Sequence, residues 1–360
     1  MRLSPSSLRV SFLVAWAVVA LWAPPSGAAT FPGLYTVTVT PDPAAADQRE
    51  AAKQAAMARL LVRVTGSRNA PLDPVARPLL ASPDRFLSSS GDDRQGRALF
   101  GFSRGEVERA LTDLGLPVWG PERPLTVLWI AVDDGTGGRA LLGAGEAAEF
   151  GAPPTPATLA MIKAVREEIV AAADERGLPI AWPLLDLQDL GAVSDTAVWG
   201  GFDAEIVAAS TRYRADAVLI GRVRPGTFGT EVDWLFVHGV DRQQLPIAGV
   251  RDGIDAAADR YATELATVGG ASVALLTVNE VRTPADYGRV VSYLERQSVL
   301  QSVDVDSFDD GILRLRVAAR GDARVLERTL ALGGVLRPAA AASSSGGPLT
   351  FELARDGATP

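Results

Sequence analysis

The segment RPLTVLWIAVDDG, residues 123–135, is the part of the chain that decides the fold. Its centre, Val127 to Val132, is a continuous apolar run with no polar residue for a solvent-facing side. A strand that is apolar on both faces is typical of a sheet covered by helices on both sides. The segments that follow alternate between helical and strand patterns and then become half-exposed strands. Residues 118–250 are therefore predicted to form a central α/β sandwich.

Two smaller units are predicted on either side of this centre. Residues 29–117 read as a strand, a long helix, two short strands and a second helix, because LYTVTVT alternates and AAKQAAMARLLVRVTG repeats its apolar residues at helical spacing. Residues 251–336 read as a helix followed by the same β-α-β-β-α order, with a hairpin turn at Asp309, Asp310 and Gly311. The predicted fold class is α/β and α+β, with two β-α-β-β-α units flanking the central sandwich.

Residues 1–28 carry the pattern of a secretory signal peptide. Arg2 and Arg9 precede an apolar stretch of 14 residues, VSFLVAWAVVALWA, and small residues follow it. A membrane-spanning helix needs about 20 residues, so the stretch is predicted to be removed, after Ala28 or Ala29, and an uncleaved anchor is the alternative. The localisation that follows is the periplasm of a Gram-negative bacterium, as an exported protein.

Composition excludes several kinds of site. The chain has no cysteine, which rules out disulfides, thiolate zinc sites and cysteine nucleophiles. It has one histidine, His238, so no metal site can use several histidines. The net charge is −8 and becomes more negative when the signal is removed, which disfavours binding to nucleic acid or an anionic membrane through bulk charge. No cofactor is predicted.

The carboxyl-terminal residues, 337–360, are predicted to be a disordered tail. The segment PAAAASSSGGP is of low complexity, and its small and polar side chains cannot bury a core. We therefore expect the tail to be dispensable for folding.

The stretch LPVWGPERPLTVLWIAVDDG, residues 116–135, together with the earlier AAKQAAMARLLVRVTG, resembles the bacterial domain-of-unknown-function family 2066. The resemblance implies an exported envelope protein and brings no functional residues with it. The central unit also resembles, more weakly, the amino-terminal domain of the Tol-system propeller protein and of flagellar accessory proteins. That second resemblance implies binding rather than catalysis, with another envelope protein as the partner.

The motif GFSRG, residues 101–105, has two interpretations. As a nucleophile elbow it would make the protein a serine hydrolase that uses Ser103 and His238, since their order along the chain fits that class. As a capping box, Ser103 would cap the helix that follows, with Glu106 bonding back to it. The preceding strand is half charged and His238 lies within an alternating strand, so the capping box is the favoured interpretation.

Two further patterns are interpreted as structural. GAGEAA, residues 143–148, has the spelling of a dinucleotide fingerprint, but the glycine and prolines in residues 151–156 stop the helix that the fingerprint requires. A mobile loop is predicted there. The acids Asp304, Asp306, Asp309 and Asp310 lack the glycine and terminal glutamate of an EF-hand, so they are predicted to lie on an exposed strand face.

A ligand site is considered where the central buried strand ends. Asp133 and Asp134 follow that strand, and α/β proteins often place sites at such strand ends. An acidic turn is the favoured alternative. Tryptophans gather in the same unit, and Trp129 and Trp199 are candidates for holding a partner peptide or a sugar.

The sequence favours a non-catalytic binding or scaffold protein of the cell envelope, with another envelope protein as its partner. One alternative is the serine hydrolase of Ser103 and His238. The other is a small-ligand or glycan-binding module that uses Asp133, Asp134, Trp129 and Trp199. No membrane span is expected after the signal is removed, and no metal or cofactor is predicted.

Overall fold

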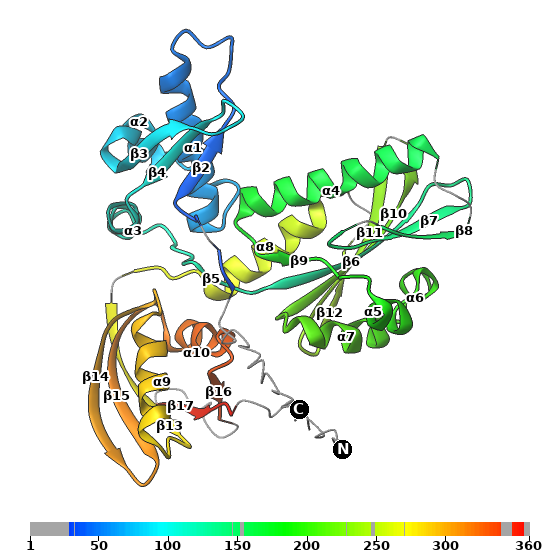
Figure 1. Cartoon of the computed structure of the whole chain (residues 1–360). Coiled ribbons are helices and arrows are strands. Elements are labelled where there is room, and N and C mark those ends of the chain that lie inside the picture. Colours follow the sequence, from blue (N-terminus) through cyan, green and yellow to red (C-terminus); the bar gives the residue numbers. More distant parts are fainter. Residues whose placement is uncertain are drawn as a thin grey trace, which may run out of the picture.

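The computed structural model describes residues 29–31, 33–145, 147–151, 155–227, 229–245, 249–269, 271–339 and 348–355. The protein is a mixed α/β structure, as the sequence predicted, and its main sheets form three units along the chain (Figure 1). The predicted signal peptide, residues 1–28, lies outside the described residues. Among the helices that are described, none is long and apolar enough to cross a membrane.

The first unit has the predicted β-α-β-β-α order. Its antiparallel sheet has the strand order β2-β4-β3, and α1 packs its apolar stripe against it. Three 3-10 turns and a short helix, which the sequence did not indicate, join α1 to β3. The elements are β2 (Thr36–Val39), α1 (Gln48–Thr65), η1 (Ala70–Leu72), η2 (Pro74–Ala76), α2 (Arg77–Ala81), η3 (Pro83–Phe86), β3 (Leu87–Asp92), β4 (Ala98–Phe102) and α3 (Arg104–Asp113).

The central unit is a seven-stranded sheet of order β12-β11-β10-β6-β7-β8, with β9 beside β6. The apolar run is β6, whose residues 127–132 are fully buried because helices cover both faces. The strands are β6 (Thr126–Asp133), β7 (Gly138–Leu142), β8 (Ala148–Gly151), β9 (Ile180–Ala181), β10 (Ala217–Gly226), β11 (Gly229–His238) and β12 (Asp241–Gln244). β6 is parallel to β10 and β9 and antiparallel to β7.

Helices lie on both sides of this sheet (Figure 1). One side carries α4 (Pro156–Arg176) and α8 (Asp252–Leu265), and the other carries α5 (Leu187–Ala192), α6 (Asp195–Gly200) and α7 (Asp203–Ser210). The sequence assigned α8 to the third unit, which is wrong, because Ile254, Ala258 and Tyr261 are buried in the central core. A two-stranded pair, β1 (Ala29–Thr30) with β5 (Glu122–Arg123), lies where the first unit meets the central one.

The third unit repeats the β-α-β-β-α order and adds two strands. Its sheet order is β14-β15-β13-β17-β16, so its first three strands are arranged as β2-β4-β3 are in the first unit. Helices α9 and α10 cover one face (Figure 1). The elements are β13 (Ala271–Asn279), α9 (Pro284–Glu295), β14 (Leu300–Asp309), β15 (Ile312–Arg320), α10 (Ala323–Leu332), β16 (Leu336–Pro338) and β17 (Leu349–Leu353).

The prediction that the chain is disordered from residue 337 onwards is wrong for residues 337–339 and 348–355. Strand β17 is an interior strand that pairs with both β13 and β16, and its Phe351 is 0% exposed. The low complexity of AAAASSSGG hid the short alternating segment LTFEL that follows it. Residues 340–347 and 356–360 lie outside the described part of the chain.

Ser103 occupies the predicted N-cap position of α3 but does not form the predicted capping box. Its backbone is extended, yet its hydroxyl makes no hydrogen bond to the helix amides. The elbow geometry is also missing, because β4 is antiparallel to both of its neighbours, β2 and β3. Ser103 belongs to the first unit, whereas His238 ends β11 in the central sheet (Figure 1).

Replacing Ser103 with alanine should therefore change the free energy of unfolding by less than about 0.5 kcal/mol. The matched control is Thr155 of α4, which has a complete capping box with Thr158. Thr155→Ala should cost about 1 kcal/mol, because the Thr158 amide loses the Thr155 hydroxyl as its acceptor. Urea unfolding of the two variants measures the difference, and an equal loss would show that the Ser103 hydroxyl does cap the helix in solution.

Candidate functional site

Asp133 and Asp134 form the turn between β6 and β7. Asp133 accepts hydrogen bonds from the Gly135 amide at 2.8 Å and from Arg139 Nε at 3.0 Å. Asp134 accepts from two turn amides and from Thr158 Oγ1 at 2.5 Å. The Thr158 hydroxyl and these amides lower the pKa of Asp134 to about 2. Both carboxylates are therefore engaged in hydrogen bonds in and around the turn. This arrangement corresponds to the acidic turn rather than to a ligand site.

The two candidate tryptophans do not join these acids in one site. Trp129 is fully buried, and its Nε1 donates to Ser210 Oγ at 2.9 Å, so it is a core residue. Trp199 is half-buried, and the Arg139 guanidinium lies 5.9 Å from its ring centre. Arg139 therefore links Trp199 to Asp133, but Asp134 and Trp129 point to other partners.

The sheet face covered by α5, α6 and α7 also carries a surface feature that the sequence analysis missed. We call residues 182–190 the Leu184 loop. It includes the start of the short helix α5 and exposes three leucines within seven residues, Leu184, Leu187 and Leu190, of which Leu187 is 92% exposed. Large apolar side chains gathered on a surface mark interaction sites more often than chance placement does.

A buried polar network fixes the Leu184 loop from below. Asp189 is fully buried, and its carboxylate accepts hydrogen bonds from the Leu185 amide at 2.9 Å, from Arg212 at 2.8 Å and from the Tyr213 hydroxyl. The same Tyr213 hydroxyl accepts from the Leu184 amide at 2.9 Å. Burial and the Asp189 carboxylate raise the pKa of Tyr213 to about 12, so its hydroxyl stays protonated and keeps donating. The network thus holds two successive backbone amides of the loop.

The loop is also held from the side, at the β7–β8 turn. Leu185 has a left-handed backbone with φ of 53°, a conformation that costs a bulky residue energy. Its side chain lies where a Cβ on Gly143 would be, at 2.6 Å, and the Ala144 amide donates to the Pro183 carbonyl at 2.7 Å. The GAG spelling at residues 143–145 therefore has a structural reason, since only glycine at 143 leaves room for Leu185.

The strained backbone conformation of Leu185 is maintained because the contacts around it fix the loop in this conformation. A rigid loop that presents leucines to solvent is suited to binding, since little conformational entropy remains to be lost when a partner covers it. One sequence signal was available. The run WPLLDLQDL, residues 182–190, has more leucines than a six-residue helix can bury on one side.

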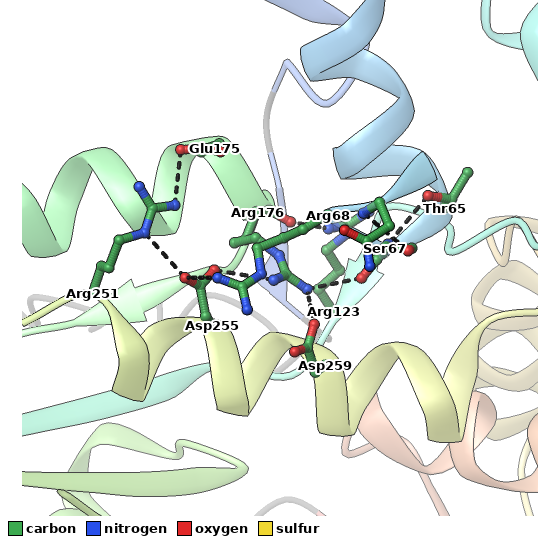
Figure 2. A network of polar contacts seen from close by, with 11 residues as sticks. Thr65, Ser67, Arg68, Arg123, Glu175, Arg176, Arg251, Asp255 and Asp259 are labelled. Atoms are coloured by element: carbon green, nitrogen blue, oxygen red, sulfur yellow. Dashed lines mark hydrogen bonds and ion pairs between the residues drawn. The ribbon is translucent and has the colours of Figure 1, made fainter. Parts of the chain in front are cut away.

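A second feature that the sequence missed is the ionic network where the units meet (Figure 2). Arg176 is fully buried at the end of α4 and donates to Asp255 at 3.0 Å, to Asp259 at 2.5 Å and to the Gly66 carbonyl at 2.8 Å. Asp255 also accepts from Arg68 at 2.9 Å and from Arg251 at 3.1 Å. The network therefore joins the end of α1 to α4 and α8.

Arg123, between these helices, is fully buried and bonds to backbone carbonyls rather than to a carboxylate. It donates five hydrogen bonds of 2.6–3.0 Å, to the carbonyls of Arg63, Trp119, Gly120, Arg176 and Gly177. Two of these carbonyls, at positions 63 and 176, belong to the last turns of α1 and α4, where the helix dipole favours a cation. The guanidinium also lies 3.9 Å from the Trp119 ring centre. Together the network and Arg123 form what we call the junction.

Comparison with known proteins covers only the first unit. Residues 28–120 match the family described as Domain of unknown function (DUF8605). The resemblance to family 2066 was therefore wrong, since the matching family is a different one and ends before most of the stretch at 116–135 that carried the resemblance. No curated protein and no solved structure matches the chain. The matched part is about a quarter of the sequence and is similar to a family without a described function.

Proposed function

We propose that this chain is a non-catalytic binding protein of the bacterial envelope, exported to the periplasm, and that it binds a protein partner through the Leu184 loop. The observation that carries the proposal is the exposure of Leu184 and Leu187 on a loop with a strained backbone at Leu185. The export rests on the signal pattern of residues 1–28.

Leu187 has the most side-chain surface for a partner to cover, since it is 92% exposed. Covering one exposed leucine side chain contributes about 1.5–3 kcal/mol to association. The entropic cost of ordering a loop on binding is small here, because Asp189 and Tyr213 already hold the amides of Leu184 and Leu185. In protein interfaces a few well-packed anchor residues contribute most of the binding energy, and apolar side chains on a rigid loop are suited to that role.

The junction supports a scaffold role for the rest of the chain. Its buried arginines tie the first unit to α4 and α8 of the central unit, and α4 contacts the same turn that holds the Leu184 loop. Arg166 of α4 donates to the Gly143 carbonyl at 2.7 Å and stacks over Trp182 at 5.0 Å. The junction and α4 therefore connect the first unit to the turn that supports the loop.

Photocrosslinking in living cells tests the proposal. A photoreactive amino acid at position 187 should yield a specific protein adduct. The matched control is position 240 in the β11–β12 turn, because Val240 is also 92% exposed. We expect an adduct at 187 and none of the same mass at 240. Leu184→Ser combined with Leu187→Ser in the unmodified chain should abolish co-purification of that partner while changing unfolding free energy by less than about 1 kcal/mol.

Two results would contradict the proposal. Equal adducts at positions 187 and 240 would show non-specific capture, and partner binding unchanged in the double serine variant would remove the loop from the interface. Stoichiometric fluorophosphonate labelling of Ser103, lost in His238→Ala, would support the hydrolase alternative instead.

A further inference from the structure

A small cavity of about 20 Å³ lies where the three units of the chain meet. The first unit contributes Glu108 of α3, and the segment that leads into the central unit contributes Trp119 and Glu122. The third unit contributes Ser298 and Arg320, and most of the lining side chains are buried. We call this feature the Trp119 cavity. It shares no lining residue with the Leu184 loop, so it is independent of the function proposed above.

Trp119 brings an unused hydrogen-bond donor to this cavity. Its side chain is 1% exposed, and within the described part of the chain its indole Nε1 has no hydrogen-bond partner. Native proteins rarely leave a buried donor without an acceptor, because the group has lost its hydration and gained nothing in return. The Cε3 edge of the ring lies against Gly66, 3.0 Å from the place that a Cβ there would take. Nε1 belongs to the opposite edge of the indole, which therefore faces away from Gly66.

The remaining polar groups of the lining offer acceptors rather than donors. The hydroxyls of Ser298, Thr267 and Thr329 each donate to an acceptor of the protein itself. Among the described residues, Glu122 accepts one hydrogen bond on each carboxylate oxygen, from the amide and from the hydroxyl of Ser298. A carboxylate oxygen has two lone pairs, so each oxygen of Glu122 can accept another hydrogen bond.

This combination selects the chemistry of the ligand. The ligand has to accept a hydrogen bond from the indole, which a metal cation or an ammonium ion cannot do. An anion could accept that bond, but the carboxylates of Glu108 and Glu122 in the lining would repel it. The volume matches one water molecule, which needs roughly 10–15 Å³ measured in this way. Water is the ligand of this size that both accepts and donates.

We infer that the Trp119 cavity is a binding site for a single ordered water molecule, which accepts from Trp119 Nε1 and donates to the Glu122 carboxylate. Buried waters of this kind satisfy polar groups that the chain leaves without partners, and removing them is costly. The same carboxylate holds the backbone amide and the hydroxyl of Ser298 in the third unit. The water therefore completes the polar contact through which the third unit docks.

A crystal structure of the mature chain tests the site, at a resolution that shows ordered water. We expect a density peak within about 3.2 Å of both Trp119 Nε1 and a carboxylate oxygen of Glu122. Trp234 is the control in the same crystal, because its Nε1 donates to the Gly249 carbonyl at 3.2 Å and should have no water bound to it. Crystals grown with bromide in place of chloride show by anomalous scattering whether the peak is a halide.

A substitution at Trp119 tests the role of the indole donor. Trp119→Phe removes Nε1 and keeps an aromatic ring beside the Arg123 guanidinium. The water peak next to Glu122 should be lost in this variant. Trp234→Phe is the matched control, since it removes another buried indole from the central core and should leave the peak at Trp119 in place.

The wild-type crystal alone can overturn the proposal, even if Trp119→Phe does not fold. The inference fails if no peak lies between Trp119 and Glu122, if the peak scatters as a halide, or if Nε1 donates directly to a protein acceptor. A peak with the same position and occupancy in Trp119→Phe would also contradict it, because the water would then be held without the indole.

Discussion

Replacing Arg123 with methionine should lower the free energy of unfolding by at least about 3 kcal/mol. Methionine fills a similar space but donates no hydrogen bond, so five backbone carbonyls lose their Arg123 donor at once. Burial lowers the pKa of Arg123 to about 9, so the side chain is still charged at neutral pH. The variant therefore also removes the cation that faces the carbonyl ends of α1 and α4.

A lysine at the same position separates charge from geometry. Arg123→Lys keeps the charge, but an ammonium has three donors on one atom and cannot reach carbonyls that lie around a planar guanidinium. Its stability should fall between those of the wild type and the methionine variant. If lysine restores the full stability, charge alone holds the junction and the five-bond geometry is unimportant.

Urea unfolding followed by tryptophan fluorescence measures these variants, because Trp119 stacks on Arg123. Arg314→Met is the matched control, since it removes an exposed arginine from β15 and should change stability by less than about 0.5 kcal/mol. Limited proteolysis gives a second readout. Cleavage near residue 120 should release the first unit from Arg123→Met much faster than from the control. Equal stability of the two methionine variants would contradict the role assigned to the junction.

The second large effect is expected at Phe351. Phe351→Ala should cost about 3–5 kcal/mol, because a fully buried ring is removed from the core that α9 and α10 form with the sheet. Phe308→Ala is the matched control, since that ring is 52% exposed and its removal should cost less than about 1 kcal/mol. Equal losses would mean that β17 is not packed in the third unit in solution.

A truncated chain that ends at Pro338 gives a test of the whole strand. Without β17, β13 loses its parallel neighbour along residues 276–279, and β16 loses its only pairing in the described sheet. Hydrogen exchange should then be much faster in β13 and in the third unit, while β6 of the central sheet keeps its protection. Wild-type protection of β13 in the truncated chain would restore the prediction of a dispensable tail.

Much of the secondary structure was predictable because its causes are local. The apolar run at 127–132 became β6, and the Asp310–Gly311 turn formed with both residues at positive φ. The helical spacing of residues 52–64 became α1, which buries those positions. Each of these patterns lies within about a dozen neighbouring residues, which is the range over which side-chain periodicity carries information.

Predictions failed where a distant partner decided the outcome. LTFEL is a short strand in any context, but only β13, more than seventy residues earlier, makes it an interior one. The apolar stripe of α8 could pack on either neighbouring sheet, and the central sheet received it. Ser103 had the residue type and spacing of a cap, but its hydroxyl makes no hydrogen bond to the helix amides.

By itself the sequence determined the mixed α/β class, the β-α-β-β-α order of the outer units and the burial of the central strand, because periodic apolar side chains select strands and helices locally. The tertiary structure alone decided the candidate sites. Arg123 meets carbonyls 53 and 60 residues away, and Asp189 meets Tyr213 across 24 residues. Hydrogen bonds between distant residues leave no periodic trace in a sequence, since each one requires only a single donor and a single acceptor brought together by the fold.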